Sequence, residues 1–397
     1  MRRGRRSYYA LNVTNRDNPE MLWKITGGAG GTLGFEELGQ SWSEPLKITV
    51  KFDSGVHDLL LFAGGYDPNQ DDVTVRTADS MGRAIYLVDA KTGALFWSAG
   101  DGNSYDLDLS EMDYSIPSNI TTIDMNGDGL VDQFYVGDMG GQLWRFDLDQ
   151  SDVKQKSKLV SGGVIADLAG STKASNRRFY YAPDLSLGVD QSDHFLAIGI
   201  GSGYRAHPLN EDVEDRFYLI KQDDYIYSAP SSYSKKTESD LYDVTLNLLV
   251  EGTDAEQKAA EVALSSSDAS KKDGWYLRLT NSGEKVLAES LTLNNQILFT
   301  TYEPAPAVAS SCEASVGQSR LYVMNLKNAT PNADRDNDGD VDKDDRVIEL
   351  KHGNIPSQPV VVDTADSPPV VMVGTEPIDG VDTGQQVVKT YWLEDEL

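Results

Sequence analysis

Short runs of alternating apolar and polar residues, rich in aromatic and β-branched side chains, recur along this 397-residue chain. Asp, Asn and Gly separate the runs, as is typical of turns between β-strands. The core of one repeated unit is an aromatic residue, followed by alternating apolar residues and often by Asp or Asn. Its copies lie at residues 8–14, 85–93, 143–148, 217–220 and 321–326. We interpret each copy as one strand of a repeated sheet.

A second repeated unit is an apolar strand that ends in small residues, which let neighbouring strands pack closely. Its copies lie at residues 59–65, 133–137, 195–201 and 370–374, and the first three each precede a copy of the first unit. Repeated strand pairs in a fixed order predict a modified β-propeller. A β-sandwich or two stacked β-domains is the alternative.

We therefore expect an all-β fold with long loop insertions and few short helices, forming a single β-propeller domain over residues 1–397. The pattern gives about five blades, and the first is incomplete at the N-terminus. Because the sequence opens directly into a strand and shows no signal peptide, we expect it to be the C-terminal part of a longer protein. The strongest helix pattern covers residues 253–264.

The charge balance narrows the possible partners. The chain carries 63 Asp and Glu residues against 35 Lys and Arg, a net charge of −28. This charge would repel nucleic acid and anionic membranes, and it favours cations or basic protein surfaces. No apolar run approaches the roughly 18 residues that a membrane span needs. We expect neither nucleic acid binding nor a membrane span.

Residues 124–132 have the spacing of a calcium loop, with Gly at the sixth position. Calcium takes about six to eight oxygen ligands, and alternating side chains of a tight loop can converge on it. The predicted ligands are Asp124, Asn126, Asp128, the backbone carbonyl of Leu130, and Asp132. Tyr135 occupies the twelfth position and offers no carboxylate, so Asp132 must close the shell, directly or through water. A hairpin turn without metal is the alternative.

Residues 334–345 form a second, more acidic loop of the same type, inserted into the propeller. Its predicted calcium ligands are Asp334, Asp336, Asp338, the carbonyl of Asp340, Asp342 and Asp345. So many carboxylates repel one another, and we expect the empty loop to be loose. A solvated acidic linker is the alternative.

Catalytic patterns are lacking in the sequence. The four histidines have no zinc spacing, and we interpret them as surface or packing residues: His57, His194, His207 and His352. The single cysteine, Cys312, has no histidine near it in sequence and is expected to be a buried thiol. Another acidic cluster lacks the required glycine, so we interpret it as a solvated turn: Asp67, Asn69, Asp71 and Asp72. We predict a protein that is not an enzyme.

Six segments together resemble the PilY/PilC family, the tip-associated adhesins of type IV pili. They are residues 7–14, 64–67, 82–97, 116–118, 124–132 and 137–145. The most specific part is the calcium loop directly ahead of a Gly-Asp-x-Gly-Gly-x-Leu-Trp-Arg strand pair. The resemblance implies a seven-bladed or similar modified propeller with calcium in the first loop. The second loop is extra to that pattern, and no Arg-Gly-Asp triplet occurs.

The resemblance also implies a function: calcium-bound protein opposes pilus retraction, and loss of calcium permits it. It places the protein in the periplasm, at the outer-membrane surface and at the pilus tip. Expected partners are major or minor pilins, and a host surface receptor bound through an N-terminal region beyond this sequence. Two alternatives stay open: a quinoprotein-like dehydrogenase, because residues 84–97 resemble that propeller's repeat, and another calcium-looped surface adhesin.

Overall fold

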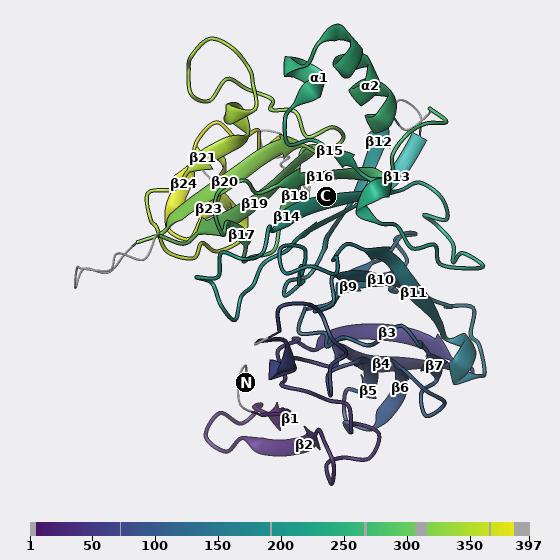
Figure 1. Ribbon diagram of the computed structural model, residues 1–397. Coiled ribbons are helices and arrows are strands. Elements are labelled where there is room, and N and C mark those ends of the chain that lie inside the picture. The colour runs from purple at the N-terminus through teal and green to yellow at the C-terminus, as the bar shows by residue number, and fades with distance from the viewer. Residues whose placement is uncertain are drawn as a thin grey trace, which may run out of the picture.

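The structure, a computed structural model, describes residues 5–71, 73–190, 193–265, 268–305, 316–364 and 367–384. Its strands form six sheets among these residues, and the sheets follow one another around the molecule in chain order. Figure 1 shows the path from β1 and β2 at the bottom, through β3–β11 on the right, to β22–β24 on the left. The arrangement is a β-propeller, as the repeated units predict. Cys312 and Asp72 lie outside the described residues.

The first three sheets are antiparallel except for one parallel pair, β6 with β7. The first contains β1 (Ser7–Asn12) and β2 (Glu20–Thr26). The second contains β3 (Leu46–Phe52), β4 (Gly55–Ala63), β5 (Ala84–Asp89), β6 (Leu95–Gly100) and β7 (Leu107–Asp108). The third contains β8 (Thr121–Ile123), β9 (Gln133–Gly137), β10 (Gln142–Leu148) and β11 (Val160–Asp167).

The remaining sheets follow the same scheme, with β15 and β16 as the parallel pair. The fourth contains β12 (Asp184–Asp190), β13 (Asp193–Gly201), β14 (Arg216–Gln222), β16 (Gly274–Arg278) and β15 (Tyr242–Asp243). The fifth contains β17 (Lys285–Val286), β18 (Leu291–Leu293), β19 (Gln296–Glu303), β20 (Gln318–Asn325) and β21 (Val347–Glu349). The sixth contains β22 (Pro359–Thr364), β23 (Ser367–Val373) and β24 (Glu376–Ile378).

The two repeated sequence units are neighbouring strands. The strands with small C-terminal residues, β4, β9 and β13, pair with the aromatic strands β5, β10 and β14. The aromatic strand β20 pairs with β19 in the same way. The predicted count of five blades was one short of the six sheets. The sheet β22–β24 was missed because it contains no copy of the aromatic unit.

Two α-helices interrupt the strands in the described part of the chain, α1 (Leu248–Glu251) and α2 (Asp254–Leu264). The predicted helix at residues 253–264 is α2. It begins where Thr253 and Glu256 form a reciprocal capping box, which satisfies two N–H groups at the helix start. Both helices lie in the long insertion between β15 and β16, so the helices decorate the propeller rather than build its core.

The loop after β4 buries a carboxylate, and here one sequence interpretation was wrong. Asp67 is fully buried and accepts hydrogen bonds from the Ser80 hydroxyl and from the N–H groups of Asn69, Ser80 and Met81. It is therefore not part of a solvated turn. The carboxylate organises the loop after β4, because it supplies acceptors for N–H groups that no strand satisfies.

Two further buried carboxyl groups are expected to titrate well above the usual Asp range. Burial raises the pKa of Asp138 to about 7 and that of Asp79 to about 6, although N–H donors to each lower it. The folded state thus binds more protons than the unfolded chain. The stability from the neutral forms is present below about pH 3.9 and is lost as pH rises through these values. NMR titration of the carboxyl groups measures these pKa values. A pKa near 4 for Asp138, like that of an exposed carboxylate, would contradict this expectation.

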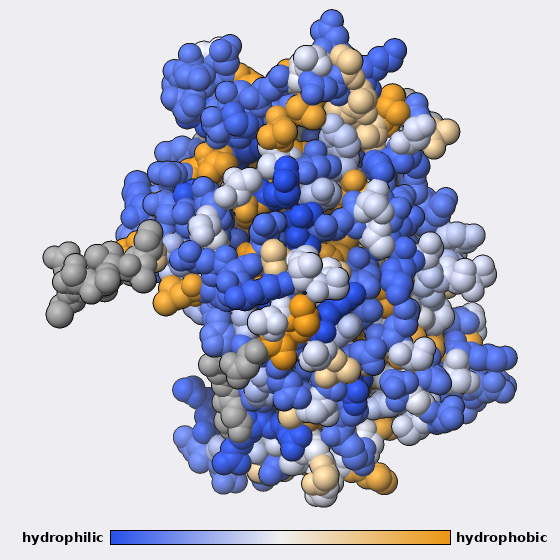
Figure 2. All heavy atoms as spheres, in the orientation of Figure 1, coloured by the Kyte–Doolittle hydropathy of each residue, from blue (hydrophilic) through white to orange (hydrophobic). Residues whose placement is uncertain are grey.

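The surface is largely hydrophilic on the face shown in Figure 2, where apolar residues form small separate groups. No helix in the described ranges is long and apolar enough to cross a membrane. The longer of the two helices, α2, has 11 residues and only three of its side chains are buried.

Candidate functional site

Residues 124–132, here called loop 1, connect β8 to β9 at one end of the third sheet. The loop is a succession of tight turns, with Gly127 and Gly129 at φ of 75° and 85°. A side chain is disfavoured at such positive φ values, so glycine is needed at both positions. The strands on either side fix where the loop begins and ends.

The side chains of loop 1 turn inward and hold its backbone. Asp124 accepts N–H groups from Gly127 and Gly129 at 2.7 and 2.8 Å. Asn126 accepts the N–H of Asp128, and Asp128 accepts that of Leu130, both at 2.9 Å. The side-chain oxygens of these alternate residues are thus turned toward the backbone of the loop.

Asp132 closes loop 1. Its Oδ2 accepts the N–H of Met125, the second residue of the loop, at 2.8 Å, and its Oδ1 lies 3.3 Å from the Asn126 amide nitrogen. The backbone of Asp132 also joins neighbouring strands: its N–H donates to Ile123, and its carbonyl accepts the N–H of Leu148. Any ion held by this carboxylate would therefore be tied to both β8 and β10.

Residues 334–345, here called loop 2, lie between β20 and β21 of the fifth sheet. The ligand oxygens of Asp334, Asp336 and Asp338 all lie within 4.8 Å of one another. No other group of three His, Cys, Asp or Glu residues in the described ranges meets this criterion. Loop 1 also has three carboxylates, Asp124, Asp128 and Asp132, but their oxygens do not all lie within this distance of one another.

Loop 2 repeats the hydrogen bonds of loop 1. Asp334 accepts the N–H groups of Asn337 and Gly339, the fourth and sixth residues of the loop. The closing group is Asp345, which accepts the N–H of the second residue, Arg335. Asp345, at the twelfth position, thus closes loop 2 as Asp132, at the ninth position, closes loop 1.

The remaining predicted ligands of loop 2 are less converged. The side chain of Asp342 accepts the N–H of Asp344 at 2.8 Å, and its own N–H donates to Asp345. The N–H of Asp340 donates to Asp338 at 2.9 Å. Direct ligation by Asp342 and by the Asp340 carbonyl stays a prediction.

Electrostatics differ between the two loops. The N–H of Gly129, with those of its neighbours, holds the pKa of Asp124 below its usual value. In loop 2, the N–H of Asp338 lowers the pKa of Asp336, but burial and the charges of the surrounding carboxylates raise it overall. A divalent cation would relieve this repulsion, so the donor set of loop 2 fits calcium.

Loop 2 is fastened to the helical insertion. Arg346, which is buried, donates to the carbonyl of Val244 at 2.7 Å and to Asn247 Oδ1 at 2.6 Å. The N–H of Lys343 donates to Glu251 of α1 at 3.0 Å. Sequence reasoning missed these contacts because the partners lie about a hundred residues apart and carry no local pattern.

Loop 1 is fastened to the neighbouring sheet through Gln150. Its amide nitrogen donates to the carbonyl of Val131 at 2.8 Å, and its Oε1 accepts the N–H of Lys51 in β3 at 3.1 Å. Gln150 thus joins the end of loop 1 to the second sheet. A conformational change in loop 1 would therefore affect both the third and the second sheet.

No family model matches the chain. The chain is 25% identical over 340 residues to the type IV pilus biogenesis factor PilY1 homolog of Xylella fastidiosa, and 24% identical over 340 residues to PilY1 of Pseudomonas aeruginosa. These matches cover 81% and 77% of the chain. The crystal structure of the Pseudomonas aeruginosa PilY1 C-terminal domain matches 94% of the chain with a TM-score of 0.61 at 18% identity.

The chain is similar to PilY1 proteins in sequence and to the PilY1 C-terminal domain in fold. The matches span only 21% and 27% of the two PilY1 relatives, and 78% of the PilY1 crystal structure. The similarity to these relatives favours the pilus hypothesis over the quinoprotein-like dehydrogenase and over another calcium-looped adhesin. The resemblance that the sequence motifs indicated is confirmed, and so is the propeller fold.

Proposed function

We propose that this chain is a calcium-binding, non-enzymatic propeller of a type IV pilus biogenesis protein. Calcium in loop 1, and in loop 2, regulates pilus extension against retraction. The observation that carries the proposal is the shared hydrogen-bond scheme of the two loops. In both loops, the carboxylate of the first residue accepts the N–H groups of the fourth and sixth residues. The closing carboxylate accepts the N–H group of the second residue.

Calcium acts in this proposal by stiffening the connections between elements. In loop 1 the ion is ligated by Asp124, Asn126, Asp128, the Leu130 carbonyl and Asp132. Asp132 also joins β8 to β10 through its backbone, so occupancy stabilises the strand ends around it. In loop 2 the ligands are Asp334, Asp336, Asp338, Asp340, Asp342 and Asp345, and occupancy stabilises the contact with α1.

We propose that the protein acts in the periplasm and at the outer-membrane surface, where it lies at the pilus tip. Its partners are pilus components, the major or minor pilins. We propose that residues 1–397 act as one propeller unit, with 334–345 as its inserted loop. A host surface receptor would engage a region outside this chain. The net charge of −28 supports partners with basic surfaces.

Replacing Asp132 with alanine in the full-length gene is expected to reduce the number of surface pili, because an empty loop 1 no longer opposes retraction. Electron microscopy of intact cells measures the effect. In a strain that cannot retract its pili, the same variant is expected to regain surface pili. Unchanged piliation in the retracting strain, with normal protein levels, would contradict the regulatory role.

A further inference from the structure

The helical insertion, residues 244–264, contains α1 and α2 and extends from the fourth sheet between β15 and β16. Loop 2 belongs to the fifth sheet, yet the two segments are neighbours: Figure 1 shows the yellow-green loop beside α1 at the top of the molecule. Contacts of Lys343 and Arg346 join them. A movement of loop 2 can therefore reach the neighbouring sheet directly.

Asp345 is the closing residue of loop 2, and its side chain is buried. The carboxylate accepts the N–H groups of Arg335, near the start of the loop, and of Asp342, near its end. The carbonyl of Asp345 accepts a hydrogen bond from the Arg335 guanidinium at 2.7 Å. The conformation of loop 2 therefore sets the position of this residue through both its side chain and its backbone.

Arg346 follows Asp345 directly, and its buried guanidinium binds the helical insertion. It donates to the carbonyl of Val244 and to Asn247 Oδ1 at 2.7 and 2.6 Å. Asn247 precedes α1 with a φ of 51°, a left-handed conformation that is uncommon outside glycine. Its carbonyl accepts the N–H of Val250, in α1, at 2.9 Å. Arg346 thus holds the turn from which α1 begins.

The two helices of the insertion are coupled to each other. A helix as short as α1 is not stable in water by itself, so it depends on its contacts. The side-chain amide of Gln257, in α2, donates to the carbonyl of Val250, in α1, at 2.9 Å. Only three side chains of α2 are buried: Ala260, Ala263 and Leu264. With so little apolar contact, α2 is expected to open at a low free-energy cost once α1 is released.

A second contact between loop 2 and α1 lies closer to the surface. The N–H of Lys343 donates to Glu251 Oε2 at 3.0 Å, and the ammonium of Lys343 lies 3.5 Å from Glu251 Oε1. Both side chains are partly exposed, so this ion pair contributes little by itself. The buried Arg346 is therefore the main connection between the loop and the insertion.

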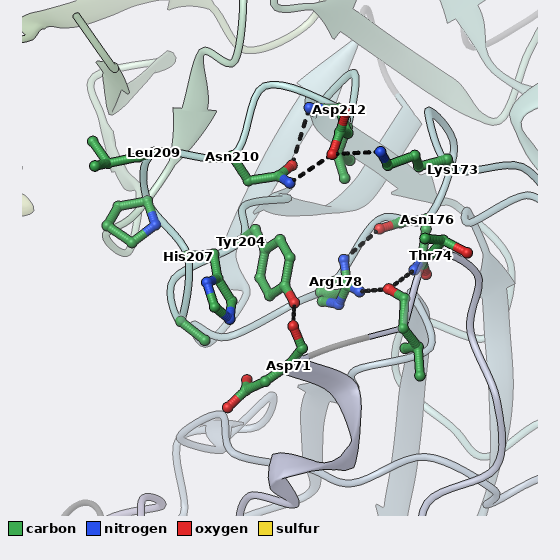
Figure 3. Close-up of a pocket in the computed structure, with 14 residues that line it drawn as sticks. Asp71, Thr74, Lys173, Asn176, Arg178, Tyr204, His207, Leu209, Asn210 and Asp212 are labelled. Carbon is green, nitrogen blue, oxygen red and sulfur yellow. Dashed lines mark hydrogen bonds and ion pairs between the residues drawn. The ribbon is translucent and has the colours of Figure 1, made fainter. Parts of the chain in front are cut away.

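Other arginines of this chain also hold distant segments together by binding backbone carbonyls. Arg178, drawn in Figure 3, donates to the carbonyls of Asn176 and Val73 at 3.0 and 3.1 Å. Arg145 binds two carbonyls in the same way. Neither residue is next to a predicted calcium ligand in the sequence. Of these three arginines, only Arg346 follows such a ligand directly, so only its contacts are expected to depend on the ion.

We propose that the helical insertion is a calcium-responsive element and that Arg346 transmits the state of loop 2 to it. This inference rests on the proposed binding of calcium by loop 2. With the ion bound, Asp345 is fixed, and Arg346 holds the insertion in place. Without the ion, repulsion among Asp334, Asp336 and Asp338 opens the loop and displaces Asp345. The fourth sheet thereby responds to calcium that the fifth sheet binds.

The response is cooperative, because Arg346 is buried together with its two acceptors. A buried guanidinium that loses its acceptors is left unsatisfied, which is costly. When loop 2 opens, the guanidinium must therefore either take the insertion with it or release α1 to solvent. In both cases the amides of α1 and α2 lose protection from exchange.

Hydrogen exchange of the intact chain, followed by mass spectrometry in calcium and in a chelator, tests the proposal. Amides of α1 and α2 are expected to exchange about tenfold more slowly in calcium. In Asp345→Asn this effect is expected to disappear, because loop 2 loses its closing ligand while loop 1 is intact. In Arg346→Met, calorimetric titration is expected to show the same number of bound ions as in the native chain, but exchange should differ by less than about twofold between the two conditions.

A surface variant guards against a folding defect in Arg346→Met. Glu251→Ala removes only the acceptor of Lys343 and is expected to reduce the calcium effect to about threefold. The matched control is Glu261→Ala, which removes the same charge from an exposed position of α2 and should keep the full effect. Thermal melts verify that all the variants fold.

Two results would overturn this inference alone. One is calcium binding by loop 2, seen as one ion more in the native chain than in Asp345→Asn, with no change in the exchange of α1 and α2. The other is a calcium effect in Arg346→Met as large as in the native chain. Equal numbers of ions in the native chain and in Asp345→Asn would instead show that loop 2 binds no calcium, which would overturn its part in the proposed function as well.

Discussion

Replacing Asp132 with alanine is expected to abolish calcium binding at loop 1 and to remove the calcium-dependent stability that loop 1 supplies. The side chain supplies both the closing ligand and the acceptor for the Met125 N–H at 2.8 Å. An ion present at a hundred times its dissociation constant stabilises the folded state by about 2.7 kcal/mol. The melting temperature in calcium should therefore fall by several degrees relative to the native chain.

In a chelator, the same variant should differ little from the native chain, because its backbone bonds to Ile123 and Leu148 remain. Asp149→Ala is the matched control: Asp149 is exposed, accepts one backbone N–H and lies outside loop 1. Calorimetric melts of the three proteins, with and without calcium, make the comparison. Equal stabilisation of Asp132→Ala and of the control by calcium would show that loop 1 is not a binding site.

Replacing Arg145 with methionine is expected to lower the free energy of unfolding by about 3–5 kcal/mol, since it leaves a buried carboxylate without its cation. Arg145 is fully buried, and its guanidinium forms a two-pronged pair with Asp147. It also donates to the carbonyls of Tyr225 and Ser228 at 2.9 and 3.0 Å. The pair thus fastens β10 to an insertion of the next sheet.

The double variant Arg145→Met with Asp147→Leu is expected to recover a large part of this loss, because no unpaired charge then remains. Burial already raises the pKa of Asp147, while Arg145 lowers it, so the single variant should shift that pKa further upward. Urea denaturation at neutral pH measures both variants. Equal destabilisation of the single and double variants would mean that the ion pair is not the source of the effect.

The sequence predicted those parts of the fold that local pattern determines. The strands β5, β10, β14 and β20 follow from alternation, and α2 follows from Thr253 and Glu256, which are three residues apart. The shared geometry of the two loops follows from the spacing of their oxygens, because ligand convergence depends on residues within a dozen positions. In each case the signal is short enough to be read from one segment.

Long-range features could not be predicted from one sequence. The segment around Asp67 looked like a solvated turn in the sequence, because the N–H groups that bind its carboxylate come mainly from Ser80 and Met81, more than ten residues away. Arg145 stands in a strand pattern that gives no sign of its partner carbonyls about eighty residues on. These contacts depend on how the sheets are placed around the propeller.

Crystals grown in calcium chloride, with data collected where calcium scatters anomalously, test most directly whether the loops hold this ion. We expect one anomalous peak beside Asp132 in loop 1 and another beside Asp336 in loop 2, each about 2.3–2.6 Å from the carboxylate oxygens. Ordered carboxylates at both loops with no peak at either, at calcium concentrations well above millimolar, would contradict calcium binding by this propeller.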